Sequence, residues 1–357
     1  MENFKKQNNI IGWIAFAIAT VVYLFTVEPT ASWWDCGEYI ATAYKLQVGH
    51  PPGAPLFQLL GRFFSLFAFG DVTKVALMIN IMSVLSSSFT ILFLFWTITM
   101  LAEKVAVREG EMTQGKMYAV LGSGLVGALA YTFSDSFWFS AVEGEVYAMS
   151  SFFTAIVFWA ILKWERIADK RHGFRWLILI AYLIGLSIGV HLLNLLAIPA
   201  IAFVYYFKKY KTTTKGIIYT AIISILILSI IMYIIVPWIV KLSSLFELFF
   251  VNSLGLPFNS GTIVYFILLI GLIVWGLKYT IKRKKVIVNT IILCFIFILI
   301  GYSSFFMLII RSNADTPIDE NSPEDAISLL SYLNREQYGD WPLLSGQYFN
   351  SPIADYG

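Results

Sequence analysis

The sequence predicts an all-α polytopic membrane protein with about nine transmembrane helices. Hydrophobic residues make up 58% of its 357 residues and charged residues only 13%, whereas soluble proteins average about 25% charged residues. Apolar runs long enough to cross a bilayer recur along the chain, and Lys and Arg gather in alternate segments between them. The net charge of +3 does not imply a nucleic-acid partner, because the charges are divided between the two sides of the membrane.

The expected spans follow one another with short connections. The first covers residues 10–27 and follows Lys5 and Lys6, which places the N-terminus inside. The single spans after it are expected at residues 75–101, 117–133, 150–162, 216–240, 262–277 and 286–310. The apolar run 176–207 has basic segments on both flanks, so we expect it to turn back near residues 189–194, as two short helices or a re-entrant pair. Residues 241–261 are expected to form an outer loop with a short amphipathic helix.

The distribution of positive charge supports nine spans with the N-terminus inside and the C-terminus outside. Nineteen of the 25 Lys and Arg residues fall in segments expected to be inside. The six expected outside are Lys45, Arg62, Lys74, Lys241, Arg311 and Arg335. We therefore expect a transmembrane domain at residues 1–310 and an outer segment at 311–357 that begins a longer soluble region. One amphipathic helix is predicted in this segment, with Ser322 as its cap and Gly339 at its far end.

Neither a disulfide nor a metal site is predicted. Cys36 lies in an outer loop and Cys294 in the middle of a later apolar run, so we expect the two at different depths. The three histidines, His50, His172 and His191, are scattered, and neither cysteine has the spacing of a metal ligand. We expect Cys36 to fill space and not to act as a nucleophile.

We interpret residues 32–55, SWWDCGEYIATAYKLQVGHPPGAP, as the active loop. If residues 35–48 form a helix, four polar side chains project from one side of it. These are Asp35, Glu38, Thr42 and Lys45. His50 and the Pro-Pro-Gly after it should end the helix and reverse the chain, and an interfacial helix carrying Arg62 should follow. The alternative is a solvated loop whose charges face water, but ionisable groups beside a bilayer are costly without a use.

Two further outer segments carry polar residues. The first holds Asp135, Glu143 and Glu145 among aromatic residues, and their alternative role is simple solvation at the interface. The second is the expected turn of the run 176–207, which places His191 and Asn194 deep or at the outer face. This pair could equally hydrogen-bond neighbouring helices without touching a substrate.

The polar chemistry therefore lies on one side of the membrane. A channel would place matched polar residues along its spans, and a transporter would show paired repeats with broken helices at mid-membrane, which we do not find in the sequence. Carboxylates at the outer surface, with a few basic groups for a phosphate, favour an enzyme that uses a lipid-carried substrate. The competing hypothesis is a transporter or an assembly scaffold without catalytic activity.

Long motifs add a family resemblance to this argument. They are WDCGEYI at 34–40, GHPPGAPLF at 49–57, EGEVYAM at 143–149, GVHLLNLL at 189–196 and RSNADTPIDENSPEDAISLLSYLNREQYGD at 311–340. Together they resemble the bacterial family catalogued as domain of unknown function 2723, a group of protein O-mannosyltransferase-like membrane glycosyltransferases of the GT-C superfamily. The resemblance covers essentially the whole chain, although members of the family are usually longer.

The resemblance implies transfer of a sugar, mannose or another hexose, from a polyprenyl phosphate to Ser or Thr hydroxyls of exported proteins. It implies a multi-pass protein of the bacterial inner membrane, with the active loop facing the periplasm. The lipid-linked sugar is the donor substrate, and we expect no cofactor. The partners implied are the bilayer, the lipid donor and the acceptor protein.

For that reaction we assign roles to the polar residues of the outer side. Asp35 is the candidate base for the acceptor hydroxyl, with Glu38 beside it in the catalytic pair. The candidates for stabilising the departing phosphate are Lys45, Arg62 and Arg311. The candidates for holding sugar or acceptor are Glu38, His50, Glu143, Glu145, His191 and Asn194.

Overall fold

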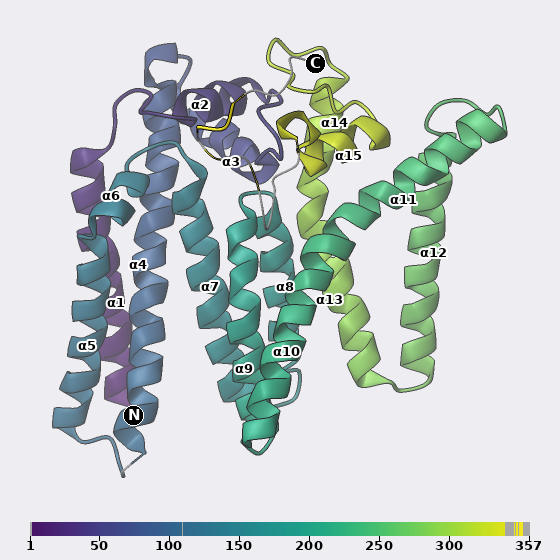
Figure 1. Ribbon diagram of the computed structural model, residues 1–357. Coiled ribbons are helices and arrows are strands. Elements are labelled where there is room, and N and C mark those ends of the chain that lie inside the picture. Colours follow the sequence, from purple (N-terminus) through teal and green to yellow (C-terminus); the bar gives the residue numbers. More distant parts are fainter. Residues whose placement is uncertain (1, 109, 340–345, 347, 349, 353–357) are drawn as a thin grey trace.

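The computed structural model describes residues 2–108, 110–339, 346, 348 and 350–352, and these are mainly helical (Figure 1). The first helices are α1 (Glu2–Thr26), α2 (Cys36–Lys45), α3 (Pro55–Ser65), α4 (Val75–Val107), α5 (Gln114–Thr132), α6 (Asp135–Ala141), α7 (Val146–Ile167) and α8 (Arg175–Ile188). The others are α9 (Ile198–Lys209), α10 (Thr214–Ile230), α11 (Val236–Leu248), α12 (Ser260–Lys282), α13 (Val286–Tyr302), α14 (Phe306–Ser312) and α15 (Ala326–Asn334). The described residues contain no strand, only an isolated bridge between Val48 and Asp319. The all-α prediction is therefore confirmed.

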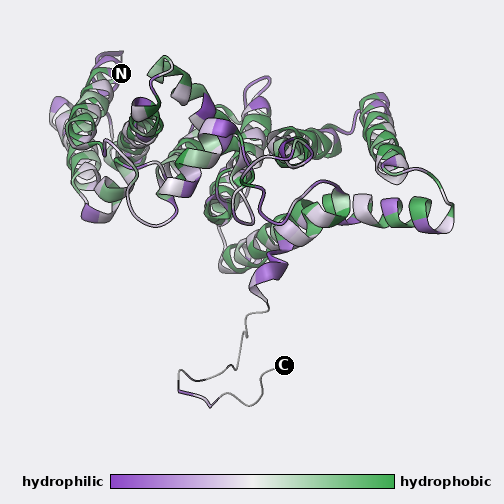
Figure 2. Ribbon diagram, turned by 90° about the horizontal axis from the view of Figure 1, so that it is seen from above, coloured by the Kyte–Doolittle hydropathy of each residue, from purple (hydrophilic) through white to green (hydrophobic). Residues whose placement is uncertain are grey.

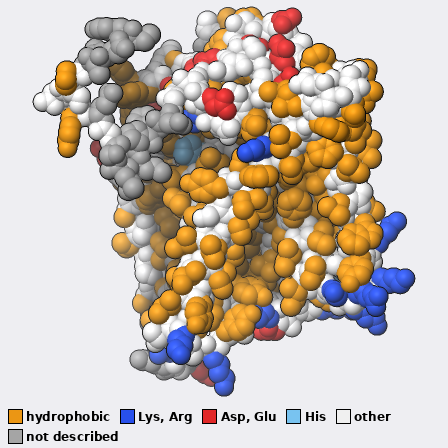
Figure 3. Space-filling view, turned by 45° about the vertical axis from the view of Figure 1, so that its right-hand side comes forward, with side chains coloured by type: hydrophobic (Ala, Val, Ile, Leu, Met, Phe, Trp, Pro, Cys, Tyr) orange, Lys and Arg blue, Asp and Glu red, His pale blue; other side chains and the backbone are white. Residues whose placement is uncertain are grey.

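The long helices run between two ends of the molecule that differ in charge. The N-terminus lies at one end, and α2, α3, α6 and α15 lie at the other (Figure 1). On the face shown in Figure 3, acidic side chains gather toward the end with α2 and α15, basic side chains gather toward the opposite end, and a hydrophobic band separates them. At the basic end, ion pairs from Lys104 to Glu165 and from Arg166 to Glu103 join α4 to α7.

Within the described residues, seven helices are long and apolar enough to cross a membrane, or eight if the bent pair α5 and α6 counts as one span. The bend in that pair is 69°. The 14-residue α8 is apolar but shorter than this criterion demands. A multi-pass protein is thus supported, and the count of nine spans stays a prediction.

The apolar run 176–207 breaks where the sequence indicated. Helix α8 ends at Ile188, and the 3-10 segment η3 (Leu192–Ala197) leads into α9. The Nδ1 atom of His191 accepts a hydrogen bond from the Leu193 amide and so caps this segment. The Leu56 amide at the start of α3 donates to the Gly189 carbonyl, 2.8 Å away. The turn is therefore fixed against the polar end of the molecule.

The segment after α10 differs from the expectation of a span ending at residue 240 and an outer loop. The helix continues as one 40-residue unit to Ser253, through two π-helical turns, η4 (Ile231–Ile235) and η5 (Phe249–Ser253). Pro237 follows η4, and a wider turn removes the clash that proline makes with the preceding carbonyl of an α-helix. The carboxylate of Glu247 accepts hydrogen bonds from the amides of Asn259 and Thr262, and these bonds close the connection to α12.

Close backbone packing joins α8 to α13. A Cβ atom on Gly185 would collide with the backbone of Ile298, and one on Gly301 would collide with the backbone of Leu186. Small residues allow membrane helices to approach in this way. By contrast, the apolar windows of the α10–α11 unit and of α12 are each only 11% buried. Seen from above, α11 and α12 form an arm at the edge of the molecule (Figure 2).

The last described helix, α15, begins later than predicted. Its N-cap is Asp325 and not Ser322, because the Asp325 side chain accepts from the Ile327 and Ser328 amides and completes a capping box. The helix closes at Arg335 in a left-handed conformation, four residues before Gly339. The outer segment expected at 311–357 lies partly outside the described residues.

Candidate active site

The first carboxylate of the site lies at the start of α2. Asp35 is the N-cap residue of this helix, and its side chain is 53% exposed. Trp33 and Trp34 precede it and are exposed, and Trp34 has a left-handed backbone. The helix ends at Lys45, three residues before the expected end at residue 48, because Leu46 adopts the left-handed conformation that terminates helices.

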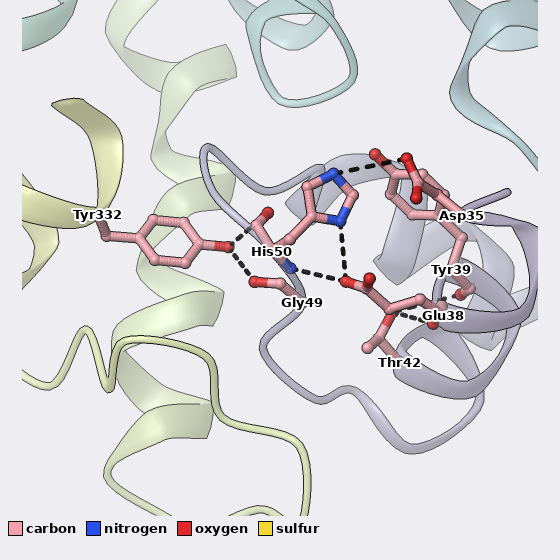
Figure 4. Close-up of polar contacts among 7 residues, drawn as sticks. All are labelled: Asp35, Glu38, Tyr39, Thr42, Gly49, His50 and Tyr332. Atoms are coloured by element: carbon pink, nitrogen blue, oxygen red, sulfur yellow. Dashed lines mark hydrogen bonds and ion pairs between the residues drawn. The ribbon is translucent and has the colours of Figure 1, made fainter. Parts of the chain in front are cut away.

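The turn after α2 brings His50 back against the helix (Figure 4). Its backbone amide lies 2.6 Å from Oε1 of Glu38, and its Nδ1 atom lies 3.0 Å from the same oxygen. Its Nε2 atom lies 3.9 Å from Oδ2 of Asp35. Burial alone would raise the pKa of Glu38, but the hydrogen bonds from His50 outweigh it and lower the pKa. The hydrogen bond with Glu38 raises the pKa of His50.

The position of His50 is fixed from both sides. The hydroxyl of Tyr332 on α15 donates to the carbonyls of Gly49 and His50, at 2.6 and 3.2 Å. On the other side, the ring of Tyr39 lies 5.6 Å from the imidazole. Gly53 turns the chain with a φ of +73°, and a Cβ at this position would lie 2.7 Å from the Tyr332 hydroxyl. The predicted reversal after His50 is confirmed, whereas Tyr332 gave no signal in the sequence.

Two further carboxylates are buried beside the N-terminus of α2. Glu143 is 5% exposed and Glu145, the N-cap of α7, is 6% exposed. Burial, followed by the charges of Asp35 and Glu143, raises the pKa of Glu145 to about 7. Burial also raises the pKa of Glu143. The alternative of a solvated interfacial pair is therefore wrong for these two residues, while Asp135 is exposed at the start of α6.

Burial also sets the protonation state of the Cys36 thiol, which lies beside these carboxylates. Desolvation and the charge of Glu143 raise the pKa of Cys36, so its thiol stays protonated. A protonated, buried thiol is a poor nucleophile. This agrees with the expectation that Cys36 fills space.

His191 is the N-cap of η3, and Asn194 lies within η3. The ring of His191 lies 5.6 Å from the ring of Tyr147 on α7, and burial lowers the pKa of His191. The Oδ1 atom of Asn194 accepts hydrogen bonds from the hydroxyls of Ser150 and Thr154. Asn194 thus binds a neighbouring helix, as the alternative in the sequence analysis allowed.

The three predicted cations gather at the other end of α2. Arg62 donates to the Tyr44 carbonyl at 2.8 Å, and Arg311 donates from Nε to the Leu46 carbonyl at 2.5 Å. The ammonium of Lys45 lies over the Tyr44 ring. Because α2 has ten residues, its length of about 15 Å separates these cations from Asp35. The two guanidinium groups therefore cap the carbonyls that the end of the helix leaves free.

Comparison with known proteins assigns the sequence of this chain to a family. Residues 35–214 match the sequence model of the family described as "Protein O-mannosyl-transferase TMEM260 N-terminal domain". The chain belongs to this family. The match begins at Asp35 and includes the glutamates and histidines of the site, whereas Arg311 and Tyr332 lie beyond it.

The O-mannosyl-transferase family includes curated relatives that are much longer. The chain is 29% identical over 195 residues to "Protein O-mannosyl-transferase tmem260" of Dictyostelium discoideum, over 53% of this chain and 22% of the relative. It is 26% identical over 174 residues to "Protein O-mannosyl-transferase TMEM260" of Mus musculus, over 48% of this chain and 22% of that relative. The aligned part thus spans about a fifth of each relative. No solved structure matches the chain.

In this member of the O-mannosyl-transferase family, one group of side chains could hold a metal ion. One ligand atom each from Asp35, Glu38 and His50 lie within 4.8 Å of one another. Sequence spacing gave no hint of this group, because the turn at residues 46–50 brings the histidine back to the helix. The expectation of no metal stays a prediction, and the hydrogen bonds of His50 to Glu38 already satisfy part of the group.

Proposed function

We propose that this chain transfers mannose from a polyprenyl phosphate to Ser or Thr hydroxyls of exported proteins. The observation that carries the proposal is the half-exposed Asp35 beside the Glu38–His50 pair, at the end of a membrane body that belongs to an O-mannosyl-transferase family. A carboxylate in this position can take a proton from a hydroxyl that approaches from the aqueous side.

The reaction needs a base and a phosphate-binding group on opposite sides of the anomeric carbon. The acceptor oxygen forms a bond to this carbon while its proton passes to Asp35, and the bond to the phosphate oxygen breaks with its electron pair. The phosphate leaves as an anion, and Lys45, Arg62 and Arg311 are our candidates for stabilising it. Because the phosphate is bonded directly to the anomeric carbon, one of these cations must move toward Asp35 when the donor binds, since about 15 Å separates them from it in this structure.

Glu38 has a positioning role in this proposal. Both of its short contacts are made with His50, so it is less free than Asp35 to take a proton from a substrate. It fixes the histidine ring with Nε2 directed toward Asp35.

Two measurements test the proposal. In the purified protein, a mannosyl-phosphoryl polyprenol and a Ser/Thr-containing acceptor should yield a hexose adduct that mass spectrometry detects. In cells, exported proteins should lose this adduct when the chain is removed. An unchanged set of hexose-bearing exported proteins would reject the proposal and favour the scaffold hypothesis.

A further inference from the structure

A cavity lies between the α11–α12 arm and α13, and residues of α14 and α15 line its outer end. Its volume is about 440 Å³, within the range of small-molecule sites. Its wall on α12 extends from Thr262 to Ile273, which is about 16 Å along a helix. Most of the lining side chains are apolar. The cavity is therefore elongated in the direction in which a lipid chain lies in a bilayer.

The cavity borders the hydrocarbon region. The arm on its outer side is the least buried part of the membrane body, since each of its apolar windows is only 11% buried. Ile300 of α13 lines the cavity and is itself 50% exposed. A lipid can therefore reach the cavity sideways from the bilayer.

The polar residues of the lining are Ser243, Asn259, Thr262, Ser303, Glu324, Asp325 and Tyr302, and the buried hydroxyl of Tyr302 points to an amphiphile. Tyr302, at the outer end of α13, lines the cavity and is 6% exposed. Its buried hydroxyl has no hydrogen-bond partner among the described residues. A buried hydroxyl without a partner is costly, so an occupant with an oxygen at this level would stabilise it.

The outer end of the cavity is joined to the candidate active site by two elements. On α15, Leu329 lines the cavity, and Tyr332 one turn later holds the Gly49 and His50 carbonyls. On α14, Ile309 lines the cavity, and Arg311 reaches the end of α2. A molecule that leaves the cavity outward therefore meets the elements that hold α2 and His50.

We propose that this cavity binds the isoprenoid chain of the lipid donor next to its phosphate, with Tyr302 donating a hydrogen bond to an oxygen of the head group. The inference rests on the proposed function and adds to it the place of the lipid. A second cavity, of about 620 Å³, lies between α4, α7 and η3. It is the competing location, and the hydroxyls of Ser150 and Thr154 line it.

The direct test uses a mannosyl-phosphoryl polyprenol with a photoreactive diazirine in its first isoprene unit. After illumination of the wild-type protein, the label should be found on peptides of α12, α13 or α14. A label on α7 or η3 would place the chain in the second cavity and overturn the inference. Transfer without any label on α12–α14 would also overturn it.

A matched pair of variants tests the same point by kinetics. Ile300→Trp fills the cavity, whereas Ile291→Trp, on the same helix and 61% exposed outside the cavity lining, does not. Ile300→Trp should raise the KM for the long-chain donor by about tenfold or more. It should leave unchanged the KM for the same head group on a short citronellyl chain. Equal effects of the two variants on the long-chain donor would contradict the inference.

The proposed function can fail separately from this inference. If the label reaches α12–α14 but no acceptor gains mannose, the cavity binds the lipid and the proposed transfer is wrong. If transfer proceeds and Tyr302→Phe, which removes only the hydroxyl, leaves the KM for the long-chain donor unchanged, the assigned hydrogen bond is wrong. Absence of both label and transfer would reject the function and the inference together.

Discussion

At the scale of single residues, the two carboxylates of α2 have separate environments. Glu38 is bound by the backbone and ring of His50, whereas Asp35 is half exposed and 3.9 Å from the free ring nitrogen. The sequence placed both on one side of a helix and made Asp35 the candidate base, but it gave no sign of the contact between Glu38 and His50. The difference arises from the turn at residues 46–50, whose left-handed Leu46 no periodicity predicts.

Asp35→Asn should abolish transfer and leave the protein folded. Asparagine keeps the shape of the side chain but cannot take a proton, and general-base catalysis contributes about 10²–10⁴-fold. We expect the transfer rate to fall by at least about 100-fold, with an unchanged elution profile in detergent. Glu38→Gln is the control and should fall less, because its amide oxygen still accepts from His50. The reverse order of the two losses would make Glu38 the base.

Glu145→Gln should change how thermal stability depends on pH. The pKa of Glu145 is raised from 4.5 to about 7, so the folded protein favours the protonated form. Stability is therefore lost as the pH rises from about 4.5 to about 7, and the full loss, about 3 kcal/mol, is present above pH 7. The melting temperature of the variant minus that of wild type should therefore be larger at pH 8 than at pH 5. A parallel shift at both pH values would contradict the assignment, and the exposed Asp135→Asn serves as a control.

At the scale of elements, α2 is held at its C-terminal end by two arginines from distant helices. Arg62 comes from α3 and Arg311 from α14, and both donate to backbone carbonyls. The sequence indicated three outer cations and a role with phosphate, but it gave no sign that two of them cap a helix. Side-chain bonds to backbone carbonyls depend on tertiary placement and leave no pattern in sequence.

Lys45→Ala and Arg311→Ala should therefore differ. Lys45 is exposed and binds no backbone carbonyl of α2 among the described contacts, so its loss should raise the KM for the donor and leave the melting temperature unchanged. Arg311→Ala also leaves carbonyls without a partner, at a cost of about 1–3 kcal/mol, and should lower the melting temperature as well. Donor titrations and thermal unfolding of both variants decide this. An unchanged KM in both would remove these cations from the phosphate site.

The other elements show which helix boundaries could be predicted from the sequence and which could not. The break in the run 176–207 followed from its basic flanks, and the structure places it at Gly189–His191 by ending α8 and starting η3. The continuation of α10 past residue 240 was missed, because Pro237 indicated a break that the π-turn absorbs. The cap of α15 was misplaced by three residues, since Ser322 and Asp325 both suit an N-cap and only the fold selects one.

At the scale of the whole molecule, composition and charge were sufficient to predict a helical multi-pass protein with the carboxylates of its candidate site at one end. The long-range contacts of the site could not be predicted from the sequence. They depend on packing between distant helices, which buries Glu143 and Glu145 and brings Tyr332 to the turn at Gly49 and His50. The separation of acidic and basic ends in Figure 3 agrees with the predicted sidedness. The orientation in the membrane stays a prediction.

Cysteine labelling measures that orientation. In a protein without native cysteines, Lys170→Cys should stay unlabelled by an impermeant reagent added outside, because the segment 163–175 holds five basic residues. Ser322→Cys, which is exposed on the opposite end, should react. Reaction of position 170 from outside would reverse the predicted topology.

The contact between Tyr332 and the Gly49–His50 turn also has a consequence for biosynthesis. The hydroxyl of Tyr332 lies 283 residues along the chain from the carbonyl of Gly49 that it binds, and Val48 pairs with Asp319 in the same region. The first loop therefore leaves the ribosome long before the residues that fix it are made. A nascent chain that has inserted only its early helices still lacks this fixation, so catalytic competence should arise only after α14 and α15 have been made.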